Sequence, residues 1–242
     1  MEERLAGGNM EPVVRVGDTV RRVAGAWTPA VHALLSVLAD AGITSVPRAL
    51  GFDEQGREVL TFLPGEVLAE AEGAVLWAEE TLVASARLLR RIHDASVALV
   101  GDDTLRWRSP GREPAEVICH NDFAPYNLIV RAGALVGAID FDFAGPGTRL
   151  WDFAYLAYRI VPFAEDAPDA DALDRVGRLT ALIDAYGATF TAQEVVSAAA
   201  DRLDDLARFT RDRAGATGRQ DLEEHAAMYE RDAVRLRASN SR

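Results

Sequence analysis

The sequence has few of the residues from which disulfides and zinc centres are built. Its 242 residues include one cysteine, Cys119, and four histidines. One cysteine can form no disulfide within the chain, and it cannot supply the several thiolates of a structural zinc site. Both kinds of site are therefore excluded.

Long apolar runs are missing as well. No stretch approaches the roughly 18 consecutive apolar residues of a membrane helix. No apolar segment follows the charged start at residues 1–4, so a signal peptide is not expected. These absences predict a cytoplasmic protein without a membrane partner.

Positive charge is scarce, with 26 basic residues against 38 acidic residues and a formal net charge of −12. A general nucleic-acid binder or a protein of anionic membranes usually has a basic face, so neither partner is expected. The balance is compatible with a cationic small molecule. The acid-rich run at residues 201–205 is a solvated helix face or, as an alternative, the lining of a pocket for such a molecule.

Residues 1–65 have the pattern of a small β-rich domain. Four strands are expected, at residues 13–16, 19–22, 48–52 and 58–63. Gly17-Asp18 is a two-residue hairpin turn, and Pro29 marks the start of a helix that ends near Gly42. Pro64-Gly65 then interrupts the chain. We therefore place a boundary between two lobes there, the first at 1–65 and the second at 66–242.

The larger segment is mainly helical. Apolar residues recur at helical spacing in several runs, at about 75–93, from 151 onward, and at 169–186, 191–211 and 221–237. Residues 117–143 interrupt this pattern with strands and loops.

Within this interruption, one hairpin brings polar residues together. Leu128–Val130 and Ala134–Ile139 are apolar strands joined by a short turn. Asn127 and Asp140 stand at the open end, so hairpin geometry places them close together. Asp122 precedes Asn127 by five residues and lies on the loop that leads into the hairpin. Carboxylate and amide oxygens are the ligands that Mg²⁺ accepts, together with phosphate oxygens and water.

Phosphoryl transfer needs two kinds of oxygen donor. Metal ligands neutralise charge on the nucleotide phosphates, and a separate carboxylate accepts the proton of the attacking hydroxyl. Asn127 and Asp140 suit the first task, and Asp122 suits the second.

The segment from His120 to Asp140 resembles the catalytic core of the aminoglycoside/choline phosphotransferases, relatives of the protein kinases. The shared pattern is His-x-Asp, four residues, Asn127, and a hairpin that ends in Ile-Asp. Asn121 stands where the family usually has glycine. The later segments at 145–147 and 151–154 also resemble the family. The resemblance implies a two-lobed protein-kinase-like α+β fold, with a small β-rich N-lobe and a larger, mainly helical C-lobe. The N-terminal lobe at 1–65 would be a shortened nucleotide-binding lobe, and residues 66–242 would be the catalytic and acceptor-binding lobe.

The resemblance also implies roles for single residues. Asp122 would be the catalytic base or the residue that orients the hydroxyl, and Asn127 and Asp140 would hold Mg²⁺ on the nucleotide. His120 would shape the catalytic loop, and Asp152 would accept hydrogen bonds from its backbone. For Asp142, two alternatives stay open: a supplementary metal ligand or an ordinary solvated acid.

The N-terminal lobe departs from the family. A kinase-like lobe has a strand lysine on the phosphates, paired with a glutamate on the next helix. We align Arg21 with that lysine, with Arg22 as the second choice, and His32 with the glutamate. Arginine can bind phosphate, although its geometry differs from that of lysine.

Four further residues of this lobe are expected to contact the nucleotide. Gly7 and Gly8 belong to a short turn that would cover the phosphates. Thr61 and Leu63 belong to the hinge that would hydrogen-bond the nucleotide base, mainly through backbone groups.

These features predict an Mg²⁺-dependent small-molecule kinase. It would transfer the γ-phosphoryl group of ATP or GTP to a hydroxyl of a small acceptor, as a monomer or a homodimer. One alternative is a kinase-fold nucleotide- or ligand-binding protein with weak or no turnover, because of the changes at Arg21 and His32. A metal-dependent hydrolase is the other alternative, although such enzymes usually have more histidines.

Overall fold

The computed structural model describes residues 2–5 and 13–240. The chain divides into two compact units. One unit comprises Met1–Ala71 and Leu88–Arg149, and the other comprises Glu72–Arg87 and Leu150–Arg242. The predicted boundary after residue 65 falls inside the first of these segments, and the predicted pair of domains stays a prediction.

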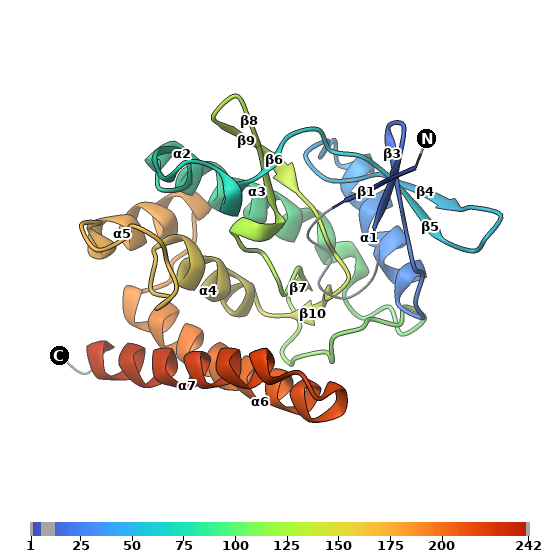
Figure 1. The fold of residues 1–242 in the computed structure, drawn as a ribbon. Coiled ribbons are helices and arrows are strands. Elements are labelled where there is room, and N and C mark those ends of the chain that lie inside the picture. Colours follow the sequence, from blue (N-terminus) through green and yellow to red (C-terminus); the bar gives the residue numbers. More distant parts are fainter. Residues whose placement is uncertain (1, 6–12, 241–242) are drawn as a thin grey trace. The chain divides into compact units, whose positions relative to one another are not determined.

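The first unit contains a five-stranded antiparallel sheet, shown in blue in Figure 1. In spatial order its strands are β1 (Glu2–Arg4), β2 (Val14–Val16), β3 (Thr19–Arg22), β5 (Glu58–Thr61) and β4 (Ala49–Phe52). Gly17 turns from β2 into β3 with a φ of 62°, and Gly56 turns between β4 and β5 with a φ of 74°. Glycine adopts such left-handed conformations without steric cost. The four strands predicted in this region are confirmed.

Helix α1 (Thr28–Asp40) follows β3 and begins next to Pro29, as predicted. Its apolar side chains at helical spacing are buried, namely Ala30, Val31, Leu34, Leu35 and Leu38. This stripe, together with Ile43 and Val46, forms the core beneath the sheet.

Two smaller sheets complete the first unit. Strands β6 (Glu66–Val67), β8 (Leu128–Arg131) and β9 (Ala134–Ala138) form one antiparallel sheet. Strands β7 (Val117–Cys119) and β10 (Gly145–Gly147) form the other. The β8–β9 hairpin was predicted, whereas β10 was not, because its Gly-Pro-Gly sequence has no strand pattern. Single 3₁₀ turns lie at Leu68–Glu70 (η1), Val97–Leu99 (η2) and Pro125–Asn127 (η3).

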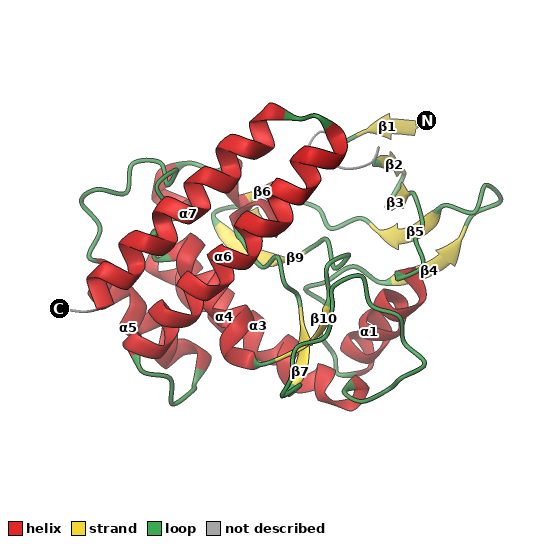
Figure 2. Cartoon of the chain, turned by 90° about the horizontal axis from the view of Figure 1, so that it is seen from below, coloured by secondary structure: helices red, strands yellow, loops and turns green. Residues whose placement is uncertain are grey.

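The second unit is helical, as predicted. It contains α2 (Gly73–Leu76), the first half of α3 (Glu79–Ser96), most of α4 (Arg149–Ile160), α5 (Arg175–Tyr186), α6 (Ala192–Thr217) and α7 (Gln220–Asn240). Helices α6 and α7 lie side by side as a long hairpin, which is visible in Figure 2. Gly218 ends α6 in the left-handed conformation that favours glycine.

Two of the predicted helices differ from the observed ones. The helix expected at 75–93 is interrupted at Trp77, between α2 and α3. The helix expected from residue 169 begins only at Arg175, because the Asp174 side chain accepts hydrogen bonds from the Val176 and Gly177 N–H groups and caps α5 there.

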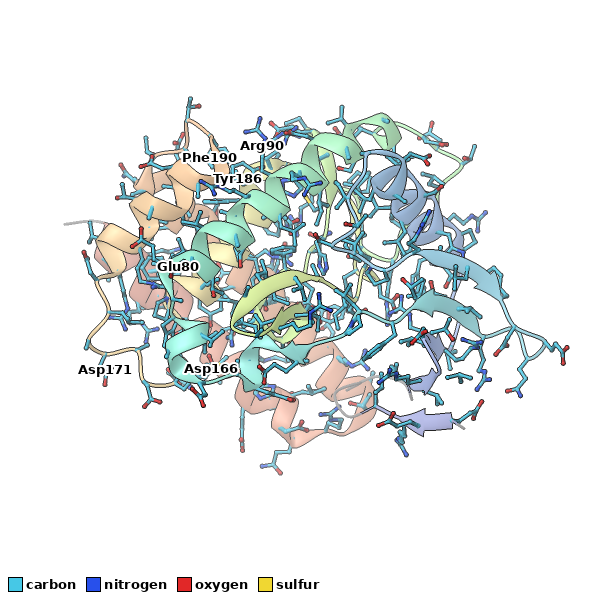
Figure 3. All side chains as sticks on the ribbon, turned by 90° about the horizontal axis from the view of Figure 1, so that it is seen from above. Glu80, Arg90, Asp166, Asp171, Tyr186 and Phe190 are labelled. Atoms are coloured by element: carbon cyan, nitrogen blue, oxygen red, sulfur yellow. The ribbon has the colours of Figure 1, made fainter. Side chains whose placement is uncertain are left out.

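Aromatic rings gather in the core of the second unit. The rings of Tyr186 and Phe190, labelled in Figure 3, stack with centroids 5.9 Å apart, and the Phe153 ring lies 4.9 Å from Tyr186. The acid-rich run is neutralised within this unit, since Arg237 of α7 lies 2.9 Å from Asp201 and 2.6 Å from Asp204. These ion pairs favour the solvated helix face over an acidic pocket.

Across the described ranges, every helix is too short or too polar to cross a lipid bilayer.

Candidate active site

The β8–β9 hairpin brings the predicted metal ligands together. Leu128 pairs with Ala138, and the Ile139 N–H donates to the Asn127 carbonyl oxygen at 2.9 Å. Asn127 therefore lies opposite Ile139, one residue from Asp140. This arrangement at the open end of the hairpin is the one that the sequence pattern predicted.

Asp122 is held by two neighbours on the same loop. The Asn127 amide nitrogen donates to the Asp122 carboxylate and to the Asp122 carbonyl oxygen, both at 2.9 Å. The Tyr126 hydroxyl donates to the other carboxylate oxygen. Each oxygen of the Asp122 carboxylate therefore accepts a hydrogen bond from a neighbour on its own loop.

The two bonds of Asn127 also show which part of its side chain is engaged. Both use the amide nitrogen, because both acceptors are oxygens of Asp122. The amide oxygen points to the other side and can ligate a cation. Asn127 is 6% exposed, so its orientation is fixed by its surroundings.

His120 is buried and connects the loop to the hairpin. One ring nitrogen, Nδ1, accepts the Asp122 N–H at 3.2 Å, so the proton of a neutral ring lies on Nε2. Nε2 lies 3.0 Å from the Ile139 carbonyl oxygen and donates to it. The ring also packs against Phe141 and Phe123. Both nitrogens are thus engaged in holding the loop next to Asp140.

Two residues of the site have a left-handed backbone, Asn121 with a φ of 63° and Asp140 with a φ of 62°. Such strain in non-glycine residues is frequent at functional sites. The value at Asn121 gives a physical reason why the resembled family has glycine there. Asparagine tolerates this conformation better than most residues, and its side chain also donates to the Phe143 carbonyl oxygen at 3.0 Å.

Arg22, at the end of β3, faces the hairpin. Its Nη1 lies 3.0 Å from the Asp140 carboxylate, and its Nη2 lies 2.7 Å from that of Asp142. Its Nε donates to Glu58, the direct partner of Arg22 across β3 and β5. Burial disfavours the charge of Arg22, but the three carboxylates outweigh it and raise the pKa of the guanidinium.

Arg21, the preferred candidate from the sequence, points elsewhere. Successive side chains of a strand face opposite sides of the sheet, so Arg21 cannot share the direction of Arg22. It donates to the Thr19 hydroxyl and lies 3.7 Å from Asp53. The structure thus places Arg22, rather than Arg21, beside Asp140. The chain contains no lysine that could take this place instead.

Glu58 and His32 stand behind Arg22. Glu58 is 1% exposed, and its second carboxylate oxygen lies 2.9 Å from His32 Nε2 of α1. His32 therefore does not replace a helix glutamate as the partner of the strand cation. That partner is Glu58, on the neighbouring strand.

Asp142 is enclosed by cationic and aromatic groups. Besides Arg22, it accepts a hydrogen bond from the Trp27 side chain and lies 3.5 Å from Arg108. The Arg108 guanidinium lies over the rings of Trp27 and Phe143, at 4.2 and 4.6 Å. Burial raises the pKa of Asp142 more than Arg22 lowers it. Asp142 is thus not an ordinary solvated acid.

The oxygens of Asn127 and Asp140 suit one Mg²⁺ whose other ligands are water and phosphate oxygens. Within the described parts of the chain, no cluster of three or more His, Cys, Asp or Glu side chains could enclose a metal. Mg²⁺ on a nucleotide, however, commonly takes one or two protein oxygens. The Asn127 amide oxygen and the Asp140 carboxylate, which is 45% exposed, would be these oxygens. The two residues therefore fit the predicted ion.

The remaining predicted residues have varied placements. Gly7 and Gly8 lie outside the described residues. The Thr61 N–H donates to the Arg48 carbonyl oxygen at 3.0 Å, and the Thr61 hydroxyl accepts the Arg48 N–H at 2.8 Å. Leu63 lies two residues beyond the end of β5. Asp152 is buried in α4, in the other unit, so its predicted support of the catalytic loop stays a prediction.

Comparison with known proteins decides the family. The profile of the phosphotransferase enzyme family matches residues 3–113 and 102–189. The chain belongs to this family. It is also 33% identical over 198 residues to the trifolitoxin immunity protein of Rhizobium leguminosarum bv. trifolii, a match that covers 76% of this chain and 73% of the relative.

Solved structures show the same fold at low identity. An ethanolamine kinase of Plasmodium vivax superposes with a TM-score of 0.70 at 12% identity, over 98% of this chain and 83% of that one. The GDP complex of aminoglycoside 2'-phosphotransferase-IIIa gives 0.69 at 14%, over 97% and 93%. A choline/ethanolamine kinase family protein of Mesorhizobium loti gives 0.65 at 18%, over 98% and 87%. The predicted kinase-like α+β fold and the resemblance are therefore confirmed, and the chain is a family phosphotransferase.

Several residues of the site were not predicted as such. These are Glu58, Tyr126, Trp27 and Arg108. The strand period places Glu58 on a strand, but only the register of β3 and β5, which the fold sets, places it opposite Arg22. Arg108 and Trp27 come from irregular segments, which carry no such period.

Proposed function

We propose that this phosphotransferase moves the γ-phosphoryl group of ATP or GTP to a hydroxyl of a small molecule and depends on Mg²⁺. The observation that carries the proposal is the pairing of Asp122 with Asn127 at the open end of the hairpin, beside Asp140. The Asp122 carboxylate is held by the neutral donors Asn127 and Tyr126, whereas the Asp140 carboxylate faces the Arg22 guanidinium. Family membership supports the same reaction class.

In the proposed reaction, Asp122 accepts a hydrogen bond from the attacking hydroxyl and then takes its proton. Asn127 fixes one oxygen of that carboxylate, and Tyr126 binds the other. His120 holds the loop in place through its two ring nitrogens. Bound Mg²⁺, held by the Asn127 amide oxygen and the Asp140 carboxylate, would neutralise charge on the phosphate oxygens.

Arg22 is the proposed phosphate contact, in place of Arg21. Its three nitrogens each face one carboxylate. A guanidinium carries five N–H groups, so N–H groups remain for a phosphate oxygen. Thr61 and Leu63 are proposed to contact the base, and Gly7 and Gly8 to cover the phosphates.

Thermal shift measurements test the nucleotide part. We expect ATP or GTP with Mg²⁺ to stabilise the intact protein, and Asp140→Ala to lose most of that shift. A panel of hydroxylated amines and aminoglycosides would then reveal the acceptor by ATP or GTP consumption. If neither nucleotide stabilises the intact protein, the proposed kinase is wrong.

A binding protein with weak or no turnover is the second candidate. Arg22 engages both Asp140 and Asp142, and arginine stands where kinase-like lobes have lysine. The name of the 33% identical relative, an immunity protein for trifolitoxin, would suit protection by binding as well as by phosphorylation. Nucleotide stabilisation without nucleotide consumption across the panel would favour this candidate.

A further inference from the structure

The buried carboxylate of Glu58 is the least expected feature of the nucleotide-binding part. Its side chain is 1% exposed and has two partners, Arg22 at one oxygen and His32 at the other. A buried charge needs such partners, so the group is fully satisfied. Its position on β5 differs from the helix position at which the family resemblance predicted a glutamate.

We propose that Glu58 is the positioning residue for Arg22, and that the carboxylate which aims the phosphate-binding cation has moved from the helix to the neighbouring strand. This inference rests on the proposed nucleotide-dependent function. His32 occupies the vacated helix position and donates to Glu58, so that α1 still contacts the pair through one hydrogen bond.

The geometry explains how Glu58 aims the guanidinium. Directly opposed residues of an antiparallel pair have Cβ atoms about 4.5–5.5 Å apart and point to the same face. Arg22 and Glu58 are such a pair. Glu58 takes the Nε side of the guanidinium, so the two terminal nitrogens extend toward Asp140 and Asp142. With Nε held, the terminal N–H groups stay on the side of the proposed metal ligands.

The Arg22–Glu58 pair joins two strands rather than a strand and a helix. A cation paired with a helix residue loses its partner when the helix moves. The Arg22–Glu58 pair is set by the register of β3 and β5, which four consecutive residue pairs define. The Arg22–Glu58 pair is therefore set by strand pairing, and α1 contributes His32 to it.

Glu58→Gln is the first test, with binding of MgATP and MgGTP measured by calorimetry. We expect the dissociation constant of the bound nucleotide to rise about tenfold, the value of one charge-assisted hydrogen bond. Asp53→Asn is the matched control, because it removes the carboxylate beside Arg21 in the same sheet. We expect this control to leave nucleotide affinity unchanged.

The double variant Glu58→Gln with His32→Glu returns the carboxylate to the helix, next to the position of Glu58. We expect it to recover most of the lost affinity, and to lower the KM for nucleotide with little change in kcat relative to Glu58→Gln. A purely structural ion pair would change thermal stability in all these variants without this KM effect. If Glu58→Gln does not fold, Glu58→Asp, which withdraws the carboxylate by one methylene, replaces it.

The outcomes separate the two proposals. An intact protein that binds neither nucleotide contradicts the proposed function. An intact protein that binds nucleotide, with a Glu58 variant that binds it equally tightly, contradicts the positioning role alone.

Discussion

The two parts of the candidate site are assembled over very different distances along the chain. Asp122 and Asn127 are five residues apart, and the hairpin that brings Asp140 to them has a turn of two residues between its strands. Arg22 reaches Asp140 from 118 residues away and depends on Glu58 and His32 from two further elements. The first part is a local structure, whereas the second exists only in the folded unit.

This difference shows which part tolerates change. A local loop and hairpin keep their geometry through backbone bonds and short-range contacts. Arg22 and the three carboxylates around it, those of Glu58, Asp140 and Asp142, form a cluster that keeps its geometry through its charges. All of these charges must be present, because removal of one partner leaves another buried without its counter-charge. We therefore expect substitutions in the loop to affect chemistry, and substitutions in the cluster to affect stability as well.

The largest effect is expected for Asp122→Asn. The variant keeps the shape of the side chain but cannot accept a proton, so turnover should fall by about 10³-fold, within the range of general base catalysis. Nucleotide binding, measured by calorimetry, should be nearly unchanged. The turn variant Asp102→Asn serves as control. Equal loss of binding and turnover would contradict the assignment of Asp122 as the base.

Arg22→Ala should show the dependence of the cluster on its charges. The variant leaves Glu58 buried with His32 as its remaining partner, so we expect the free energy of unfolding to fall by about 3 kcal/mol, as for other broken buried pairs. Urea denaturation measures this change. Arg21→Ala, one residue away on the opposite face of the sheet, should cause a much smaller loss. Equal losses of unfolding free energy in the two variants would contradict the assignment of Arg22 as the partner of the buried carboxylate.

Gly137→Ala tests how closely the hairpin packs on residues 1–71. A Cβ atom at Gly137 would collide with the Ser45 carbonyl oxygen and the Leu63 side chain. We expect overpacking to lower the free energy of unfolding by about 2 kcal/mol. Gly215→Ala in α6, where a Cβ atom meets open space, should not destabilise the protein. If Gly137→Ala leaves the free energy of unfolding unchanged, the hairpin packs loosely against Ser45 and Leu63.

The smallest effect is expected for Tyr126→Phe. The change removes one hydrogen bond to Asp122 and leaves the bond from Asn127 in place. Turnover should fall by about threefold to tenfold, corresponding to roughly 1 kcal/mol for one hydrogen bond. Steady-state kinetics with the identified acceptor measures it. A loss as large as that of Asp122→Asn would make Tyr126 part of the chemistry itself.

Much of the fold could be predicted because its signals are local. The alternation in β2 and β3, the turn at Gly17 and the apolar spacing of α1 each depend on neighbouring residues. The β8–β9 hairpin and the meeting of Asn127 with Asp140 also follow from local pairing. By contrast, β10 pairs with β7 across 26 residues or more, and its Gly-Pro-Gly sequence shows no preference for a strand.

The choice between Arg21 and Arg22 shows where prediction from the sequence ends. The two residues are adjacent and chemically identical, and only the register of β3 decides which one faces the hairpin. Glu58 was assigned to a strand without a role, because its partner lies 36 residues away. The alternatives for Asp142 could likewise not be resolved, since its partners Trp27 and Arg108 come from distant irregular segments.

The sequence by itself determined the candidate reaction centre that we propose, because Asp122, Asn127 and Asp140 occur in one short segment whose hairpin fixes their approach. Tertiary structure decided which cation faces that centre and which carboxylate holds it. Ion pairs between distant segments depend on strand register and burial, and neither quantity is written in the spacing of residues along the chain.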